Sequence, residues 1–310
     1  MIRDIQVQPK AVRILSGTIR KNRIPTSILL SGEIGTGKRF AAINYAKAIN
    51  CLAPADNDSC DNCISCRKID SNLHPDVFFV EPDNDEIKID AIRKLEDNLC
   101  LKSFEGRKKI AVVDSADRMN NSAANAFLKT LEEPPDNSII ILISSNDDGL
   151  PDTIKSRCVK INFYPLPLED CRRIMSNHVS PGDLSLFINL AMGRPGIAGR
   201  RNFSEEKAWF FKLYNNMLNY NSKDIWADKE QIGVWLDMSL VLLRDIIVYD
   251  ITDNESDVLL CIPPKRNSMT KALDAYDTLE QVRSLLGYNL NRQVTWNYVA
   301  GVIKKQAFLD

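Results

Sequence analysis

One loop near the start of the chain has residue types suited to binding phosphate. Gly32, Gly35, Gly37 and Lys38 stand at the spacing of a phosphate-binding loop. In such a loop the glycines let backbone N–H groups close on phosphate oxygens, the lysine reaches the outer phosphates, and the next residue offers a hydroxyl to magnesium. Here that residue is Arg39, which has donors only and a positive charge. We therefore expect a nucleotide-type fold without productive Mg-ATP hydrolysis. The sequence does not decide whether ATP binds to it.

The other half of a nucleotide site is expected where the apolar run 109–113 ends in Asp114. An aspartate at this point can hold a magnesium-bound water. Many ATPases of this kind have a glutamate next, which polarises the attacking water, whereas this chain has Ser115, a residue without comparable basicity. Both departures together predict a nucleotide fold that has lost its own catalysis. We expect Arg39 and Asp114 to pair and fill the site without metal.

Four cysteines beyond the loop have the spacing of a metal site. Cys60, Cys63 and Cys66 form a C-x-x-C-x-x-C pattern, and Cys51 precedes them. Four thiolates suit a tetrahedral structural zinc and leave no open position for catalysis. A disulfide cluster is the alternative, but we expect reduced thiols because no signal-peptide pattern precedes them and a cytoplasmic location is expected. His74 is a less favoured replacement for one ligand.

Composition narrows the class of protein. The chain has 310 residues, which is longer than a domain with a single hydrophobic core usually is, and 44% of the residues are hydrophobic. No apolar run approaches the ~20 residues that cross a bilayer, so no membrane partner is expected. A formal net charge of −1 argues against coating nucleic acid by bulk electrostatics. Basic groups at 20–23, 107–109 and 304–305 are more often solvated surface than DNA contacts.

The elements that must position these residues fall into three parts. Over residues 1–164, strand-like runs alternate with helical patterns, which predicts an α/β domain with a parallel sheet that carries the cysteine module 51–66. After Pro165 and Pro167 the strand pattern ends. We predict a helical lid at 165–204 and an all-α collar for oligomerisation at 205–310, with apolar stripes that read as core rather than as a cofactor site.

Two further segments carry a resemblance. Residues 127–135 read Phe-Leu-Lys-Thr-Leu-Glu-Glu-Pro-Pro, and residues 150–158 read Leu-Pro-Asp-Thr-Ile-Lys-Ser-Arg-Cys. With the cysteine spacing and His74-Pro75-Asp76, they resemble the clamp-loader subunits of bacterial DNA polymerase III, which belong to the AAA+ class, over about residues 25 to 200. Within that family the resemblance is to the delta-prime type, because its nucleotide site is commonly degraded while the gamma/tau motor subunits keep a complete one.

The resemblance implies partners and a role for Arg157. Such subunits work in a five-membered complex with gamma/tau and delta subunits, which opens the sliding clamp and places it on primed DNA. The arginine of the Ser-Arg-Cys motif, here Arg157, is implied to enter the ATP site of a neighbouring subunit and to neutralise charge that develops there. Without the motif, a surface arginine paired with a carboxylate would be the simpler interpretation. Ser144, Ser145 and Asn146 are candidates for a first nucleotide sensor.

Three interpretations remain. In the first, the chain is a stator that is not catalytic by itself and gives Arg157 to a neighbour. In the second, it is a gamma/tau-type motor that hydrolyses ATP and tolerates Arg39. A third, an unrelated nucleotide kinase with a zinc-bearing lid, leaves the segments 127–135 and 150–158 unexplained.

Overall fold

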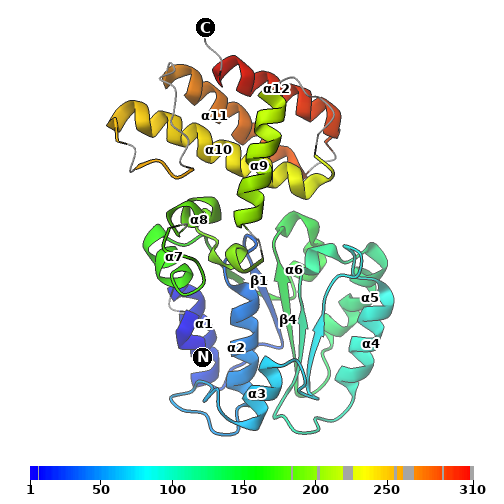
Figure 1. Ribbon diagram of the computed structural model, residues 1–310. Coiled ribbons are helices and arrows are strands. Elements are labelled where there is room, and N and C mark those ends of the chain that lie inside the picture. The colour runs from blue at the N-terminus through cyan, green and yellow to red at the C-terminus, as the bar shows by residue number, and fades with distance from the viewer. Residues whose placement is uncertain are drawn as a thin grey trace. The chain divides into compact units, whose positions relative to one another are not determined.

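The structure is a computed structural model that describes residues 1–5, 7–182, 184–200, 203–218, 226–254, 257–260, 269–287 and 290–307. It divides into two compact units (Figure 1). Unit 1 comprises Met1–Asp170 and Gly193–Ile197, and unit 2 comprises Cys171–Met192 and Ala198–Asp310. The predicted division into a lid and a collar at residue 205 stays a prediction.

Unit 1 is built on a five-stranded parallel sheet, which confirms the predicted fold class. The strand order is β2-β3-β4-β1-β5. The strands are β1 (Ser27–Ser31), β2 (Val77–Val80), β3 (Lys109–Val113), β4 (Ser138–Ser144) and β5 (Val159–Asn162). All residues of β1, β3 and β4 are buried. Both faces of these strands are therefore covered, which is why they read as continuous apolar runs in the sequence.

Helices cover the two faces of this sheet. On one face η1 (Ile2–Ile5), α1 (Pro9–Arg20) and α2 (Lys38–Asn50) share a core with β1 and β4, and on the other α4 (Ile89–Cys100) and α5 (Asn121–Glu132) share a second core with β3 and β4 (Figure 1). The shorter helices of this region are α3 (Ile64–Asp70), η2 (Ala116–Arg118), η3 (Asp147–Gly149), α6 (Asp152–Lys155) and η4 (Pro195–Arg200). The carboxyl ends of the strands thus open toward loops that carry the predicted nucleotide residues.

The described part of unit 2 is helical, as expected for the C-terminal region. Its helices are α7 (Leu168–Met175), whose first three residues belong to unit 1, α8 (Leu184–Ala191), α9 (Phe203–Leu218), α10 (Lys229–Thr252), α11 (Met269–Ser284), η6 (Leu285–Gly287) and α12 (Arg292–Ala307). Trp226, Trp235 and Trp296 pack against one another within its core, with Trp226 and Trp296 edge-to-face at 4.9 Å between ring centroids. No helix in the described ranges is long and apolar enough to cross a bilayer.

A degenerate nucleotide site and a candidate metal centre

The phosphate-binding loop lies between β1 and α2, the context that the motif requires. Gly32, Gly35 and Gly37 have φ angles of +146°, +87° and +95°. Residues other than glycine rarely adopt these φ angles, so the glycines give the loop the backbone conformation of a phosphate cradle. At Gly35 an added Cβ would lie 2.8 Å from Cγ1 of Ile197, so the cradle is also closely packed.

Groups of unit 1 itself engage this cradle. The amide of Gly196 donates to the carbonyl of Gly35 at 3.0 Å. The ammonium of Lys38 donates to the carbonyls of Gly32 and Glu33, the second at 2.7 Å. A phosphate bound by the loop would have to draw Lys38 away from these carbonyls.

Arg39 makes the contact that the sequence predicts. Its Nη1 donates to Oδ2 of Asp114 at 2.9 Å and also forms an ion pair with Glu81. The guanidinium lies over the ring of Phe79, 5.8 Å from the centroid. Burial alone would lower the pKa of Arg39, but the two carboxylates outweigh it and raise that pKa. A fixed cation therefore stands beside the acidic residue that would otherwise serve magnesium.

Glu81 was missed at the level of sequence. It follows β2 as Asp114 follows β3, and the register pairs Val80 with Val113. Because neighbouring parallel strands end at the same edge, the two carboxylates become lateral neighbours. The sequence shows an acidic residue at the end of each of the two apolar runs. Only the strand order shows that these two residues lie side by side.

Arg157 lies just after α6 and reaches α5. Its Nη1 donates to the carbonyl of Thr153 at 2.7 Å, and its Nη2 donates to the carboxylate of Glu132. The arginine side chain is 34% exposed and the glutamate side chain 50% exposed. The two segments that carry the family resemblance therefore meet at this ion pair. Action of Arg157 on a neighbouring subunit stays a prediction.

The candidate sensor residues Ser144, Ser145 and Asn146 form hydrogen bonds within the loop after β4. The hydroxyl of Ser144 donates to the carbonyl of Asn146 at 3.0 Å, and the amide of Ser145 donates to Asp117 at 3.1 Å. The side chain of Asn146 is exposed and accepts from the amide of Asp148. These contacts fix the turn after β4, and a sensor role stays a prediction.

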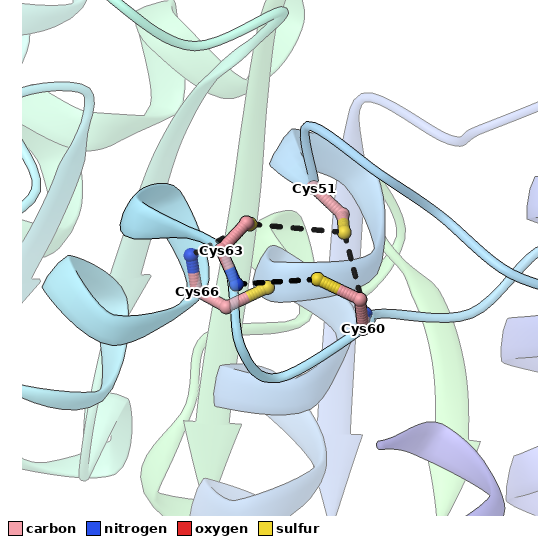
Figure 2. Close-up of side chains that lie close together, drawn as sticks. All are labelled: Cys51, Cys60, Cys63 and Cys66. Atoms are coloured by element: carbon pink, nitrogen blue, oxygen red, sulfur yellow. Dashed lines mark hydrogen bonds between the residues drawn. The ribbon is translucent and has the colours of Figure 1, made fainter.

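The four predicted cysteines come together. The Sγ atoms of Cys51, Cys60, Cys63 and Cys66 all lie within 4.8 Å of one another, and Figure 2 shows the four side chains converging. Sγ of Cys51 and Sγ of Cys63 are 4.0 Å apart. Tetrahedral zinc with Zn–S distances of about 2.3 Å requires sulfur atoms about 3.8 Å apart, so the cluster could hold a metal ion of this kind.

Backbone amides support negative charge on these thiols. The amides of Cys60, Cys63 and Cys66 donate to Cys51, Cys60 and Cys63 at 3.3, 3.3 and 3.4 Å, contacts that Figure 2 marks in part. Burial alone would raise the pKa of Cys63, but amide donors outweigh it and lower that pKa to about 6. At Cys51 and Cys66 burial prevails and raises the pKa of the thiol. A thiolate is the metal-binding form, so the donors favour a metal.

Carboxylates also fix the loop that carries the cysteines. Asp58 accepts from the amides of Ile2 and Arg3 at 2.9 and 3.1 Å. Asp61 pairs with the largely buried ammonium of Lys47 at 3.0 Å. The loop is therefore attached to η1 and α2 by charge as well as by its cysteines.

His74 is outside the thiol cluster. Its Nδ1 accepts from the amide of Asp76 at 3.1 Å. The fully buried Asp76 carboxylate in turn accepts from the amides of Phe104, Glu105 and Gly106, the last two at 2.7 Å. The His-Pro-Asp segment thus orders the loop after α4 rather than binding metal.

Comparisons with known proteins agree with this architecture. The family described as "DNA polymerase III, delta subunit" matches residues 7–167. DNA polymerase III subunit delta' of Bacillus subtilis is 32% identical over 266 residues, which cover 81% of this chain and 80% of that protein. The protein of the same name from Pseudomonas aeruginosa is 39% identical over 291 residues, which cover 85% of this chain and 87% of that protein.

A solved structure supports the fold alone. A DNA polymerase III gamma subunit-related protein from Thermotoga maritima matches with a TM-score of 0.51 at 20% identity, over 96% of this chain and 100% of that one. The AAA+-type parallel sheet with a helical C-terminal region is thereby shown, and the extent of the sequence matches decides the family. The chain belongs to the delta' subunit family of DNA polymerase III.

Proposed function

We propose that this chain is the stator of a bacterial clamp loader, a delta-prime-type subunit that does not hydrolyse ATP itself. It assembles with gamma/tau motor subunits and a delta subunit in the cytoplasm, and the complex loads the sliding clamp on primed DNA. The observation that carries the proposal is the guanidinium of Arg39 bound between Asp114 and Glu81.

This ion pair network opposes magnesium chemistry. Magnesium requires oxygen ligands in near-octahedral geometry, and Arg39 both engages the Asp114 carboxylate and adds a like charge beside the ion. Ser115 supplies no general base for an attacking water. The chain then keeps the fold of a nucleotide site, with Gly32, Gly35, Gly37 and Lys38, but does not hydrolyse ATP.

Arg157 supplies the chain's contribution to catalysis, in the ATP site of a neighbouring motor subunit. Its guanidinium is partly exposed, and the Glu132 carboxylate that holds it is half exposed. Exposed ion pairs are worth only about 0–1 kcal/mol, so a phosphate can displace Glu132 at small cost. An arginine at the outer phosphate accelerates phosphoryl transfer by ~10³ to 10⁵ in well-characterised cases.

We propose that the metal of Cys51, Cys60, Cys63 and Cys66 is zinc with a structural role. An all-sulfur set of four ligands selects zinc among common metals and leaves no open coordination position. When bound, zinc would cross-link the loop between α2 and α3, and the carboxylates Asp58 and Asp61 orient that loop on its neighbours.

The first test uses the metal-loaded chain alone. ATP and magnesium are titrated while binding and phosphate release are followed in the same samples. We expect no phosphate release. Magnesium-dependent turnover that Lys38→Ala abolishes would identify the chain as a gamma/tau-type motor and overturn the stator assignment.

The second test uses the complex with gamma/tau and delta subunits. Arg157→Ala should reduce ATP hydrolysis while assembly stays intact on size-exclusion chromatography. Arg118→Ala is the matched control, because Arg118 is another exposed arginine of unit 1 that pairs with a carboxylate, that of Asp85. Equal activity of the Arg157→Ala complex and the control complex would refute the role in trans.

A further inference from the structure

One face of α1 carries positive charge only. The helix reads Pro-Lys-Ala-Val-Arg-Ile-Leu-Ser-Gly-Thr-Ile-Arg, without an acidic residue. Lys10, Arg13 and Arg20 stand three, seven and ten positions apart and therefore share one side of the helix. Ala11 and Leu15 are buried on the opposite side, against the core of unit 1. The orientation of the helix thus fixes the basic face toward solvent.

The protein does not neutralise these charges. Lys10, Arg13 and Arg20, together with Lys21 and Arg23 directly after the helix, are exposed. Within the described ranges none of these five side chains takes part in a hydrogen bond or an ion pair. Several other cations of the same unit are paired, namely Lys47 with Asp61 and Asp70, Lys68 with Glu105, and Arg118 with Asp85. The positive charge of the α1 face therefore remains available to attract an external anion.

Gly17 stands in the middle of this face. A Cβ added there would meet nothing within 4 Å, so the centre of the face is flat and open. Glycine inside a helix is destabilising relative to alanine, and the interior of unit 1 does not require it at this point. A flat centre lets an extended partner approach the helix backbone between the flanking cations.

We infer that this face, Lys10, Arg13, Arg20, Lys21 and Arg23, binds the phosphate backbone of duplex nucleic acid. Lys10 and Arg20 are about 15 Å apart along the helix axis, and duplex DNA carries one charge per strand about every 3.4 Å, so the face spans about four phosphates of one strand. No aromatic side chain lies on the face to anchor a protein partner. The contacts are with phosphate only, so the binding is independent of sequence.

This surface supplies local charge to a chain whose net charge is −1. Binding is therefore confined to one face and is strongly dependent on salt. About four to five phosphate contacts predict a slope of log K against log salt of about −4. Such binding is a property of the chain alone, whether it serves as a stator or as a motor.

The test measures fluorescence anisotropy of a labelled duplex of about 25 base pairs with the full chain between about 50 and 200 mM salt. The triple variant Lys10→Gln, Arg13→Gln, Arg20→Gln should weaken binding at least about tenfold and reduce the magnitude of the salt slope by about 3. The triple variant Arg93→Gln, Lys94→Gln, Lys102→Gln is the control, because it removes the same charge from exposed residues around α4. It should change affinity much less and leave the slope near that of the parent chain.

Gly17 offers a second comparison at one position. Nothing within 4 Å opposes either side chain, so Gly17→Ala and Gly17→Glu should both fold, which circular dichroism checks. The alanine should retain binding, and the glutamate should weaken it as strongly as the loss of one or two cations.

Three results would overturn the inference. They are absence of binding by the unmodified chain at the lowest salt, equal losses in the two triple variants, and equal binding by Gly17→Ala and Gly17→Glu. Competition by polyglutamate as effective as that by unlabelled duplex would assign the face to an acidic protein instead.

Discussion

Nη1 of Arg39 donates a hydrogen bond to Oδ2 of Asp114 at 2.9 Å, at the edge where β2 and β3 end. The two motif departures of the nucleotide site are therefore physically connected. If Asp114 were absent, the half-buried guanidinium of Arg39 would keep only the more exposed Glu81 as a partner. Asp114 in turn would face Glu81 as a like charge if Arg39 were absent.

Replacing Arg39 by Thr should expose this dependence. The hydroxyl that a nucleotide site requires returns, but Asp114 and Glu81 lose their shared cation and repel each other. We expect a loss of about 1–2 kcal/mol in the free energy of unfolding in urea without divalent ions, because a hydrogen-bonded charge pair is broken. Magnesium should recover part of that loss in the variant and none in the parent chain.

Arg39→Lys is the control, since it keeps the charge but not the guanidinium geometry. It should retain more stability than Arg39→Thr and gain nothing from magnesium. Equal stability of the parent chain and Arg39→Thr would contradict a structural role for the pair.

The sequence predicts the part of this site that a linear motif defines. Arg39 and Asp114 each occupy a position set by its own motif, so their pairing follows from the fold class. Glu81 belongs to no motif and enters only because β2 is the neighbour of β3. Asp58 is similar, since its contacts are with the amides of Ile2 and Arg3, which are distant in sequence. Contacts that depend on the lateral order of elements are the ones that sequence patterns do not contain.

Glu132 should restrain Arg157 before the complex assembles. Its carboxylate binds Nη2, one of the donors that would meet a phosphate. Glu132→Gln removes the charge and keeps the shape, so we expect the reconstituted complex to hydrolyse ATP faster at subsaturating ATP, by about two- to fivefold, as an exposed pair allows.

The neighbouring Glu133→Gln is the matched control, because Glu133 is also exposed at the end of α5. It should leave the rate unchanged. A lower rate with Glu132→Gln would mean that the carboxylate positions Arg157 for the neighbour instead of competing with it.

Loss of the metal centre should loosen the cysteine loop before it unfolds unit 1. Cys66→Ser removes a buried ligand, and we expect loss of bound zinc and a fall in Tm of at least about 5 °C, which corresponds to ~2 kcal/mol in a domain of this size. Because Asp58 and Asp61 still attach the loop, the parallel sheet should persist.

Zinc content by elemental analysis and Tm by circular dichroism measure this effect. Cys100→Ser is the control, since Cys100 is exposed and lies outside the thiol cluster. It should change neither quantity. Full zinc binding by Cys66→Ser would show that the four thiols do not form the metal site.

Asp76 should make stability sensitive to acid. Burial alone would raise the pKa of its carboxyl group, but the amides of Gly106, Phe104 and Glu105 and the charge of Lys109 lower that pKa below its ordinary value. The unfolded chain has the ordinary value of about 3.9. The stabilisation is therefore complete above about pH 5 and is lost as the pH falls through the lower, folded pKa.

Asp76→Asn should accordingly cost about 2 kcal/mol in the free energy of unfolding at pH 7, because charged acceptors form the stronger hydrogen bonds. The difference from the parent chain should shrink below pH 4, since the parent carboxylate becomes protonated there. Urea unfolding at several pH values measures both effects, with Asp97→Asn on the exposed side of α4 as the control. The two chains could instead differ in free energy of unfolding by the same amount at pH 7 and pH 3. That result would show that the charge of Asp76 does not contribute to the stabilisation.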